Sequence, residues 1–316
     1  MTPGARRQDE RGFALLAVLL VVALLGMVGA EFAYSMRLEA SAARAWRDGI
    51  AATHLAEAAV EQAIREIVAD AQFVGVDEAG VMTFYTRERT ARPRLSREKV
   101  PLGMGHFTYR ITDEEARLNL NTTPPERLDR LLQQLGLDKS ERDVIVNSLL
   151  DWRDPNEEHR LSGAESDDYY LKLPVPYRSR NANLESVSEL LQIRGVTPTL
   201  FRGSDGKPGL ADFVSVKTRG QVNINTASEP VLRAHGLSDA EVSLILQTRS
   251  DEPFFTPPSQ FGGRGFVVNT QTFRIEAEGL VGDRVQARIT AVVQRRADPA
   301  ATGGAGVAYL EWWAGR

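Results

Sequence analysis

The chain has 316 residues, a net charge of −4 at pH 7 and no cysteine. The lack of cysteine excludes disulfide bonds and thiolate metal sites, so the fold must be stabilised by packing. The slightly acidic balance gives no support for binding a polyanion such as DNA. Beyond its apolar N-terminal segment the chain keeps about 280 residues, enough for one large domain or two smaller ones.

An apolar run without any charged residue covers 13–30, behind a basic flank that contains Arg6, Arg7 and Arg11. As a helix rising about 1.5 Å per residue, this run is about 27 Å long and spans most of a bilayer core. The basic flank favours the cytoplasmic side. The sequence therefore predicts one membrane pass, with the rest of the chain on the far side. A cleaved signal peptide and a plain signal anchor are the alternatives.

The helical pattern continues beyond the apolar run. Apolar or small residues recur every three or four positions up to Ile67, with charged residues between them. This spacing predicts one amphipathic helix from about 13 to about 72, with its first third in lipid and the remainder against a soluble domain. A signal peptide would instead end in a small-residue cleavage site and a polar mature start.

The basic leader, the Gly12-Phe13 step, the apolar run and its amphipathic continuation together resemble the type IV pilin and pseudopilin class. The resemblance implies that a prepilin peptidase cleaves after Gly12 and methylates Phe13, the new N-terminal residue. The usual glutamate at the fifth mature position is replaced by Ala17. In the class this glutamate pairs with the N-terminus of a neighbouring subunit. Because an unpaired charge in lipid is costly, Ala17 indicates a tip subunit without a neighbour above it.

After the long helix the sequence pattern alternates between strand and helix. Residues 113–206 have a helical pattern, with 18 acidic and 12 basic residues. A hairpin is predicted around Gly282-Asp283. β-Branched and aromatic residues predict strands at 81–86, 105–111, 213–216, 272–279, 285–293 and 307–313. The predicted fold is α+β, with a long N-terminal helix packed on an antiparallel sheet and an α-helical insert.

This pattern divides the chain into five parts. We expect a leader at 1–12, the transmembrane part of the helix at 13–36 and the first pilin-like part at 37–112. The α-helical insert covers 113–206, and the second pilin-like part covers 207–316.

An internal repeat lies in the helical region. Asn119-Leu120-Asn121-Thr122 and Asn223-Ile224-Asn225-Thr226 each precede two short helices around a glycine turn. The turns contain Gly136 and Gly236, and a third turn contains Gly195. Capping-box spacing is present in the pairs Thr123/Glu126, Thr226/Glu229, Ser186/Glu189 and Ser238/Glu241.

These units resemble the helix-hairpin-helix module, which binds the DNA backbone in some competence and repair proteins. The alternative function is therefore a membrane-anchored DNA-binding protein of a competence-like system. DNA-binding modules usually carry two glycines in the turn and basic residues beside it. Here each turn has one glycine and the surrounding segment is acidic, which favours packing or protein contact.

Five segments, 113–122, 149–155, 167–170, 190–196 and 222–226, resemble the minor pseudopilin K family of type II secretion systems. The combination is specific, whereas each piece alone is weak. The resemblance implies a bacterial inner-membrane protein with its C-terminal domain in the periplasm. It implies assembly with minor pseudopilins I and J and the major pseudopilin, processing by prepilin peptidase, and no nucleic acid. Such a complex caps, and initiates, the pseudopilus.

An acidic cluster in the insert is a candidate calcium site. Its residues lie in a loop around Pro155 and Gly163 and offer the hard oxygen ligands that calcium prefers. The spacing does not match an EF-hand, and a solvated acidic loop is the alternative. The resemblance implies calcium in the insert. The candidate ligands are Asp151, Asp154, Glu158, Glu165, Asp167 and Asp168.

The sequence contains no enzyme motif. His54, His106, His159 and His235 are scattered, without a His-Glu-x-x-His pair, and there is no phosphate loop or nucleophile elbow. We therefore expect no catalytic activity. Near the C-terminus, the adjacent pair Trp312-Trp313 lies in a predicted strand, where neighbours face opposite sides. One tryptophan is predicted to pack on the core and the other to be exposed.

Overall fold

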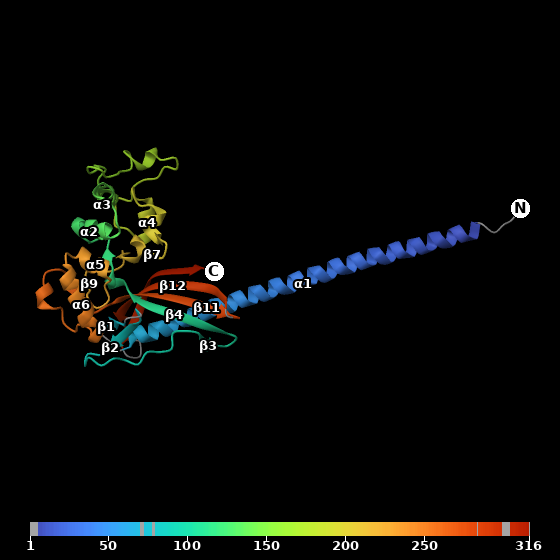
Figure 1. The fold of residues 1–316 in the computed structure, drawn as a ribbon, viewed down its shortest axis with the longest axis horizontal. Coiled ribbons are helices and arrows are strands. Elements are labelled where there is room, and N and C mark those ends of the chain that lie inside the picture. Colours follow the sequence, from blue (N-terminus) through green and yellow to red (C-terminus); the bar gives the residue numbers. More distant parts are fainter. Residues whose placement is uncertain (1–5, 70–72, 78–79, 283, 299–303, 316) are drawn as a thin grey trace.

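The computed structural model describes residues 6–69, 73–77, 80–282, 284–298 and 304–315. Its longest element is helix α1, Arg6–Val68. The N-terminal half of α1 extends away from the rest of the molecule, and its C-terminal part lies against the sheet (Figure 1). The prediction of one continuous helix through the apolar run is confirmed, although the helix ends at Val68 rather than near 72.

The main sheet has five antiparallel strands in the order β13-β12-β11-β4-β3. Four of these strands, β4, β11, β12 and β13, were predicted from the sequence and are confirmed. The predicted hairpin between β11 and β12 is confirmed by their antiparallel pairing. The bounds are Val100–Leu102 for β3, Gly105–Asp113 for β4, Thr272–Val281 for β11, Arg284–Ala297 for β12 and Ala305–Gly315 for β13. The fold is therefore α+β, with a long helix on an antiparallel sheet.

Helix α1 packs closely on the sheet because small residues line the contact. Ala52, Ala56, Ala59 and Ala63 are fully buried against it. A Cβ added to Gly279 of β11 would lie 1.8 Å from the backbone oxygen of Ala52, so only glycine fits there.

Two short strands lie outside the main sheet, directly after α1. β1, Phe73–Val76, and β2, Met82–Tyr85, form a separate antiparallel hairpin. The strand predicted at 81–86 is thus confirmed. The ring of Phe73 contacts the ring of Phe255 edge to face at 5.2 Å, which connects this hairpin to the helical part of the molecule.

The helical part forms a second hydrophobic core that runs from Leu118 to Val268. The expected boundary between the insert and the second pilin-like part, after residue 206, falls inside this core, because the second repeat packs on the first. The α-helices are α2 (Pro125–Gln134), α3 (Lys139–Arg153), α4 (Pro198–Arg202), α5 (Glu229–Ala234) and α6 (Asp239–Asp251). Short 3₁₀ turns are Glu114–Ala116, Tyr170–Lys172, Val187–Gln192, Leu210–Asp212 and Ser259–Phe261.

The helical pattern predicted for 113–206 is only partly right. Between α3 and α4 the described backbone has only 3₁₀ turns, since Pro155, Pro174 and Pro176 cannot donate the hydrogen bonds of a helix. The helical part also contains six strands of two residues each among the described residues. β5 (Leu118–Asn119) pairs in parallel with β8 (Val214–Ser215), β9 (Val222–Asn223) pairs in parallel with β10 (Phe266–Val267), and β6 (Gly203–Ser204) pairs with β7 (Lys207–Pro208).

Candidate functional sites in the anchor, the acidic loop and the glycine turns

The free half of α1 has the length and composition of a membrane-spanning helix. Its most apolar window has a mean hydropathy of 2.8 and none of its side chains is buried. Phe13 is 76% exposed, and Ala17 lies one turn further along the same helix. An apolar helix of this exposure is stable only when lipid or other protein chains cover it.

The acidic loop begins with a buried carboxylate, Asp151, at the C-terminal end of α3. It accepts hydrogen bonds from the backbone N–H of Ala164 at 2.9 Å and from Nη1 of Arg160 at 2.6 Å. The same Arg160 nitrogen contacts Asp154 at 2.5 Å. The single positive charge of the guanidinium is therefore shared between two carboxylates, and burial of Asp151 is compensated by ionic hydrogen bonds.

The other candidate ligands lie further apart. Glu158 is exposed, Asp167 lies 3.8 Å from Arg178, and Asp168 lies 3.5 Å from Lys172. Within the described ranges, no three Asp, Glu or His side chains form a group that could hold a metal ion. The structure thus brings together Asp151 and Asp154 but leaves Asp167 and Asp168 in surface ion pairs.

Two oxygens in this loop are buried without a hydrogen-bond partner, namely Oε1 of Glu165 and Oδ1 of Asn181. Burial raises the pKa of Glu165, and the charges of Asp151 and Glu157 raise it further. Nδ2 of Asn181 donates to Oε1 of Glu157 at 3.0 Å. A buried acceptor without a donor favours a cation or water beside it. Asn181 was not among the predicted ligands, because an asparagine in an irregular loop has no distinctive sequence signal.

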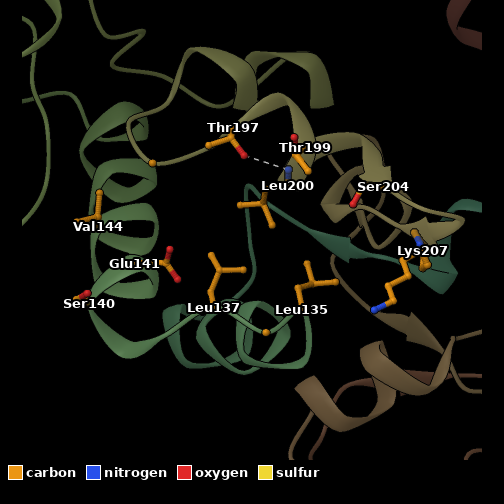
Figure 2. A pocket seen from close by; sticks show the side chains of 14 residues that line it. Leu135, Leu137, Ser140, Glu141, Val144, Thr197, Thr199, Leu200, Ser204 and Lys207 are labelled. Atoms are coloured by element: carbon orange, nitrogen blue, oxygen red, sulfur yellow. Dashed lines mark hydrogen bonds between the residues drawn. The ribbon is translucent and has the colours of Figure 1, made fainter.

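Two of the glycine turns face one groove (Figure 2). This groove has a volume of about 650 Å³ and lies between the turn of Gly136 and the turn of Gly195. Leu135, Leu137 and Leu200 point into it. Glu141 of α3 lines one side of the groove and Lys207 of β7 lines the other (Figure 2).

The groove is poorly suited to a phosphate. Glu141 on one wall repels an anion and Lys207 on the other attracts one, so the two charges offset each other. The Gly195 turn is packed against α3, where an added Cβ would lie 2.8 Å from Ile145. Positive φ angles of 88° at Gly136 and 91° at Gly195 explain the glycines through backbone conformation alone. The Gly195 turn therefore packs against α3, whereas the glycine of the Gly136 turn is explained by its backbone conformation.

The repeated asparagines have equivalent structural roles. Asn121 exchanges hydrogen bonds with the backbone of Leu184, donating to its oxygen at 2.9 Å and accepting from its nitrogen at 2.8 Å. Asn225 does the same with the backbone of Phe254, at 2.9 and 2.7 Å. Each second asparagine of a repeat thus holds a distant loop segment in place. The two units are related in structure as well as in sequence.

Three consecutive acids, Asp113, Glu114 and Glu115, form the joint between the sheet and the helical part, a role that sequence reasoning missed. Asp113 is buried and accepts hydrogen bonds from Asn223 at 2.9 Å, from Thr226 at 2.6 Å and from Thr270. Burial raises its pKa. In a sequence, a run of acids after a strand is typical of a solvated turn, so only the distant partners identify the joint.

The next two acids differ in charge state. Burial alone would raise the pKa of Glu114, but Arg117 and Arg274 outweigh it and lower the pKa. Burial, followed by the charge of Asp113, raises the pKa of Glu115 to about 8. Glu115 lines a cavity of about 160 Å³ together with Arg219. Glu114 is therefore an ionised partner of arginines, whereas the environment of Glu115 favours its protonated form.

The four histidines lie on different parts of the chain. His54 lies on α1, His106 on β4 and His159 in the acidic loop, 3.9 Å from Asp168. His235 follows α5, where burial and the charge of Arg127 lower its pKa to about 4. The prediction that one tryptophan packs on the core is wrong, because Trp312 is 43% and Trp313 44% exposed.

Comparison with known proteins places this architecture in a family. Residues 111–203 match the family model described as "Type II secretion system (T2SS), protein K". The type II secretion system protein K of Pseudomonas aeruginosa is 28% identical over 321 residues, which cover 92% of this chain and 91% of that protein. The putative type II secretion system protein K of Escherichia coli K12 is 26% identical and covers 78% of this chain and 77% of its own length.

A solved structure has the same fold. It is a chain in the crystal structure of the GspK-GspI-GspJ complex from the enterotoxigenic Escherichia coli type 2 secretion system. It superposes with a TM-score of 0.62 at 18% identity and covers 89% of this chain and 99% of its own length. With its long apolar helix, antiparallel sheet and helical insert, the chain matches the type II secretion system protein K family in sequence and in fold.

Proposed function

We propose that this minor pseudopilin occupies the tip of a periplasmic pseudopilus, in a complex with minor pseudopilins I and J and above the major pseudopilin. The observation that carries the proposal is α1. Its N-terminal half is apolar and exposed, whereas its C-terminal part is buried in the sheet. Such a helix anchors the chain in the inner membrane and offers neighbouring subunits a surface for packing.

Ala17 and the helical part support the position at the tip. Ala17 removes the carboxylate that would need a partner above it, since an unpaired charge in lipid costs a few kcal/mol. The helical part lies at the end of the molecule opposite the N-terminus of α1 (Figure 1). A mass of that size has free space at a filament end but not between stacked subunits.

Processing by prepilin peptidase is part of the same proposal. Cleavage after Gly12 and methylation of Phe13 would release the basic leader and leave an apolar N-terminus. Mass spectrometry of the mature chain tests this step. An N-methylated Phe13 supports it, and a mature chain that still carries Arg6 and Arg7 contradicts it.

The position at the tip has its own test. Because the chain contains no cysteine, an Ala182→Cys variant in the exposed loop of the helical part carries a unique thiol. Gold particles coupled to this thiol should mark one end of isolated pseudopili in electron micrographs, and wild-type protein is the unlabelled control. Regular labelling along the shaft would overturn the tip assignment.

A calcium ion in the acidic loop completes the proposal. The support for a calcium ion at this loop comes from two buried oxygens without a hydrogen-bond partner, Oε1 of Glu165 and Oδ1 of Asn181. Calcium takes carboxylate, amide, carbonyl and water oxygens together, so two side chains suffice when water and backbone supply the rest. Asp151 and Asp154 add negative potential nearby, although Arg160 already contacts both. The ion would stabilise a loop that has little regular structure of its own.

A further inference from the structure

The outer edge of β13 is the row of backbone groups of Ala305–Gly315 that faces away from β12. β13 is the last strand of the main sheet and pairs with β12 from Ala305 to Gly315. Over the parts of the chain that the structure describes, no strand pairs with its other side. Figure 1 shows this strand along the border of the sheet. Alternate N–H and C=O groups of eleven residues are therefore available to another strand.

Proteins usually protect such an edge, and the opposite edge of this sheet is protected. β3 has only three residues and contains Pro101, which cannot donate a hydrogen bond. β13 has neither lysine nor proline among its residues. Its one charged residue, Glu311, pairs with Lys217 at 3.3 Å and its side chain is only 13% exposed. A β-bulge at Leu310 interrupts its pairing with β12, but the edge is otherwise long, uncharged and without the other usual devices that prevent pairing.

Aromatic side chains flank this edge on both faces of the sheet. Tyr309 and Trp312 contact each other with ring centroids 5.6 Å apart. The hydroxyl of Tyr309 donates to Oε1 of Glu61 on α1 at 3.3 Å, so this pair lies on the face that α1 covers. Trp313 is the next residue and lies on the other face. Large, half-exposed aromatic residues are the typical anchors of protein interfaces.

From these observations we infer that the edge of β13 binds an extended, uncharged apolar strand of a smaller minor pseudopilin, which continues the sheet. The inference rests on the proposed assembly with such subunits. Backbone hydrogen bonds to β13 supply the pairing. Tyr309 and Trp312 on one face of the sheet, and Trp313 on the other, contact alternate side chains of the added strand. A charged strand is disfavoured, because its charges would lie between Trp312, Trp313 and Tyr309 without partners.

A second copy of the chain does not fit this edge. Ala52 of α1 lies beside Gly279, which pairs with Ala287 near the start of β12. Further along α1, the oxygen of Ile67 accepts a hydrogen bond from Arg295 near the end of β12. α1 therefore runs parallel to β12 and antiparallel to β13. Symmetric antiparallel pairing of two β13 strands would point the two α1 anchors in opposite directions, which one membrane cannot accommodate.

Hydrogen exchange on the full-length protein in detergent tests the inference. The chain is compared alone and after co-purification with minor pseudopilins I and J of its own secretion system. About half of the β13 amides point outward in an antiparallel edge, and these should exchange at least about tenfold more slowly in the complex. Outward-facing β13 amides that exchange as fast in the complex as in the chain alone would overturn strand pairing.

A matched pair of variants separates the edge from general surface effects. Trp312→Lys places a charge at the open edge, and Leu102→Lys places the same charge on the protected edge strand β3, where Leu102 is 48% exposed. Trp312→Lys should weaken the complex with I and J at least about tenfold, whereas Leu102→Lys should leave it unchanged. A thermal melt of each variant shows whether it is folded, and the exchange comparison on wild-type protein stands even if one variant is not.

The outcomes distinguish this inference from the proposed function. If I and J do not associate with the wild-type chain at all, the proposed assembly itself fails. If they associate while the β13 amides exchange as fast as before, the assembly stands and the edge inference is overturned. Concentration-dependent protection of β13 in the chain alone would identify a second copy as the occupant and also overturn it.

Discussion

The carboxylate of Asp113 accepts a hydrogen bond from Nδ2 of Asn223 at 2.9 Å, and so joins the last residue of β4 to the second asparagine repeat. The same carboxylate also accepts from Thr226 of the repeat and from Thr270 just before β11. The joint between sheet and helical part is therefore a buried polar cluster rather than a linker. Removing one member leaves others unsatisfied, so the two parts are expected to unfold together.

Glu115, beside this joint, predicts an unusual pH dependence. Its pKa is raised from the ordinary value of 4.5 to about 8 in the folded protein, mainly by burial. A raised carboxyl pKa means that the folded state holds a proton that the unfolded state has lost. Its stabilising contribution is full below pH 4.5 and is lost as the pH rises through about 8, at up to about 1.4 kcal/mol per pH unit.

The slope of the unfolding free energy against pH has to be compared between variants. His235 contributes a slope of opposite sign between about pH 6.5 and 4, because its pKa is lowered in the folded protein. Glu115→Gln should flatten the decline of the unfolding free energy between pH 5 and 8 in denaturant titrations. Glu98→Gln, on an exposed loop, should retain the wild-type decline. Equal slopes in Glu115→Gln and wild type would show that Glu115 is ionised in the folded state.

Gly279→Ala tests the close packing of α1 on the sheet. The added Cβ would lie 1.8 Å from the oxygen of Ala52, so the helix must move away from β11. We expect a loss of about 3 kcal/mol in unfolding free energy, at the upper end for overpacking. Gly315→Ala on β13 meets no atom within 4 Å and is the control. A neutral Gly279→Ala would mean that α1 does not contact β11 this closely.

Asn225→Ala should destabilise the second repeat. The side chain donates to the oxygen of Phe254 and accepts from its nitrogen, and the variant leaves both backbone groups without a partner. A cost of about 2–3 kcal/mol is expected for these unsatisfied buried groups. Asn183→Ala, with an exposed side chain, should change the melting temperature little. If both variants melt alike, the Asn225 bridge does not stabilise the fold.

Glu165→Gln tests the calcium proposal. At a hundredfold excess over Kd, an ion that binds only the folded chain adds about 2.7 kcal/mol, which raises the melting temperature by several degrees. We expect the chelator EDTA to lower the wild-type melting temperature and to have little effect on Glu165→Gln. Asp167→Asn, on the surface, should respond as wild type does. Insensitivity of the wild type to both calcium and EDTA would contradict the proposal.

The sequence alone determined the long helix, four of the five strands of the main sheet and the presence of the repeat. Each of these depends on local pattern, because apolar spacing or alternation reports which side of an element is buried. Ser238 with Glu241, and Ser186 with Glu189, form the capping boxes that their spacing predicted. Thr123 and Thr226 do not. The N-cap positions are Pro124 in α2 and Ser228 in α5, and neither side chain makes a capping hydrogen bond. Thr226 donates its hydroxyl to Asp113 instead.

Tertiary structure decided how the two repeats share one core, which acids are buried, and which edge of the sheet is open. Asp113 and Asp151 are buried, whereas Asp167 and Asp168 lie at the surface, although the sequence pattern around all four is similarly acidic. The two buried carboxylates differ from the exposed ones in their hydrogen-bond donors. Asp113 accepts from Asn223, which is distant in the chain, and Asp151 accepts from Arg160 in a folded loop. A carboxylate can be buried only where such donors converge, and convergence depends on the path of the whole backbone rather than on neighbouring residues.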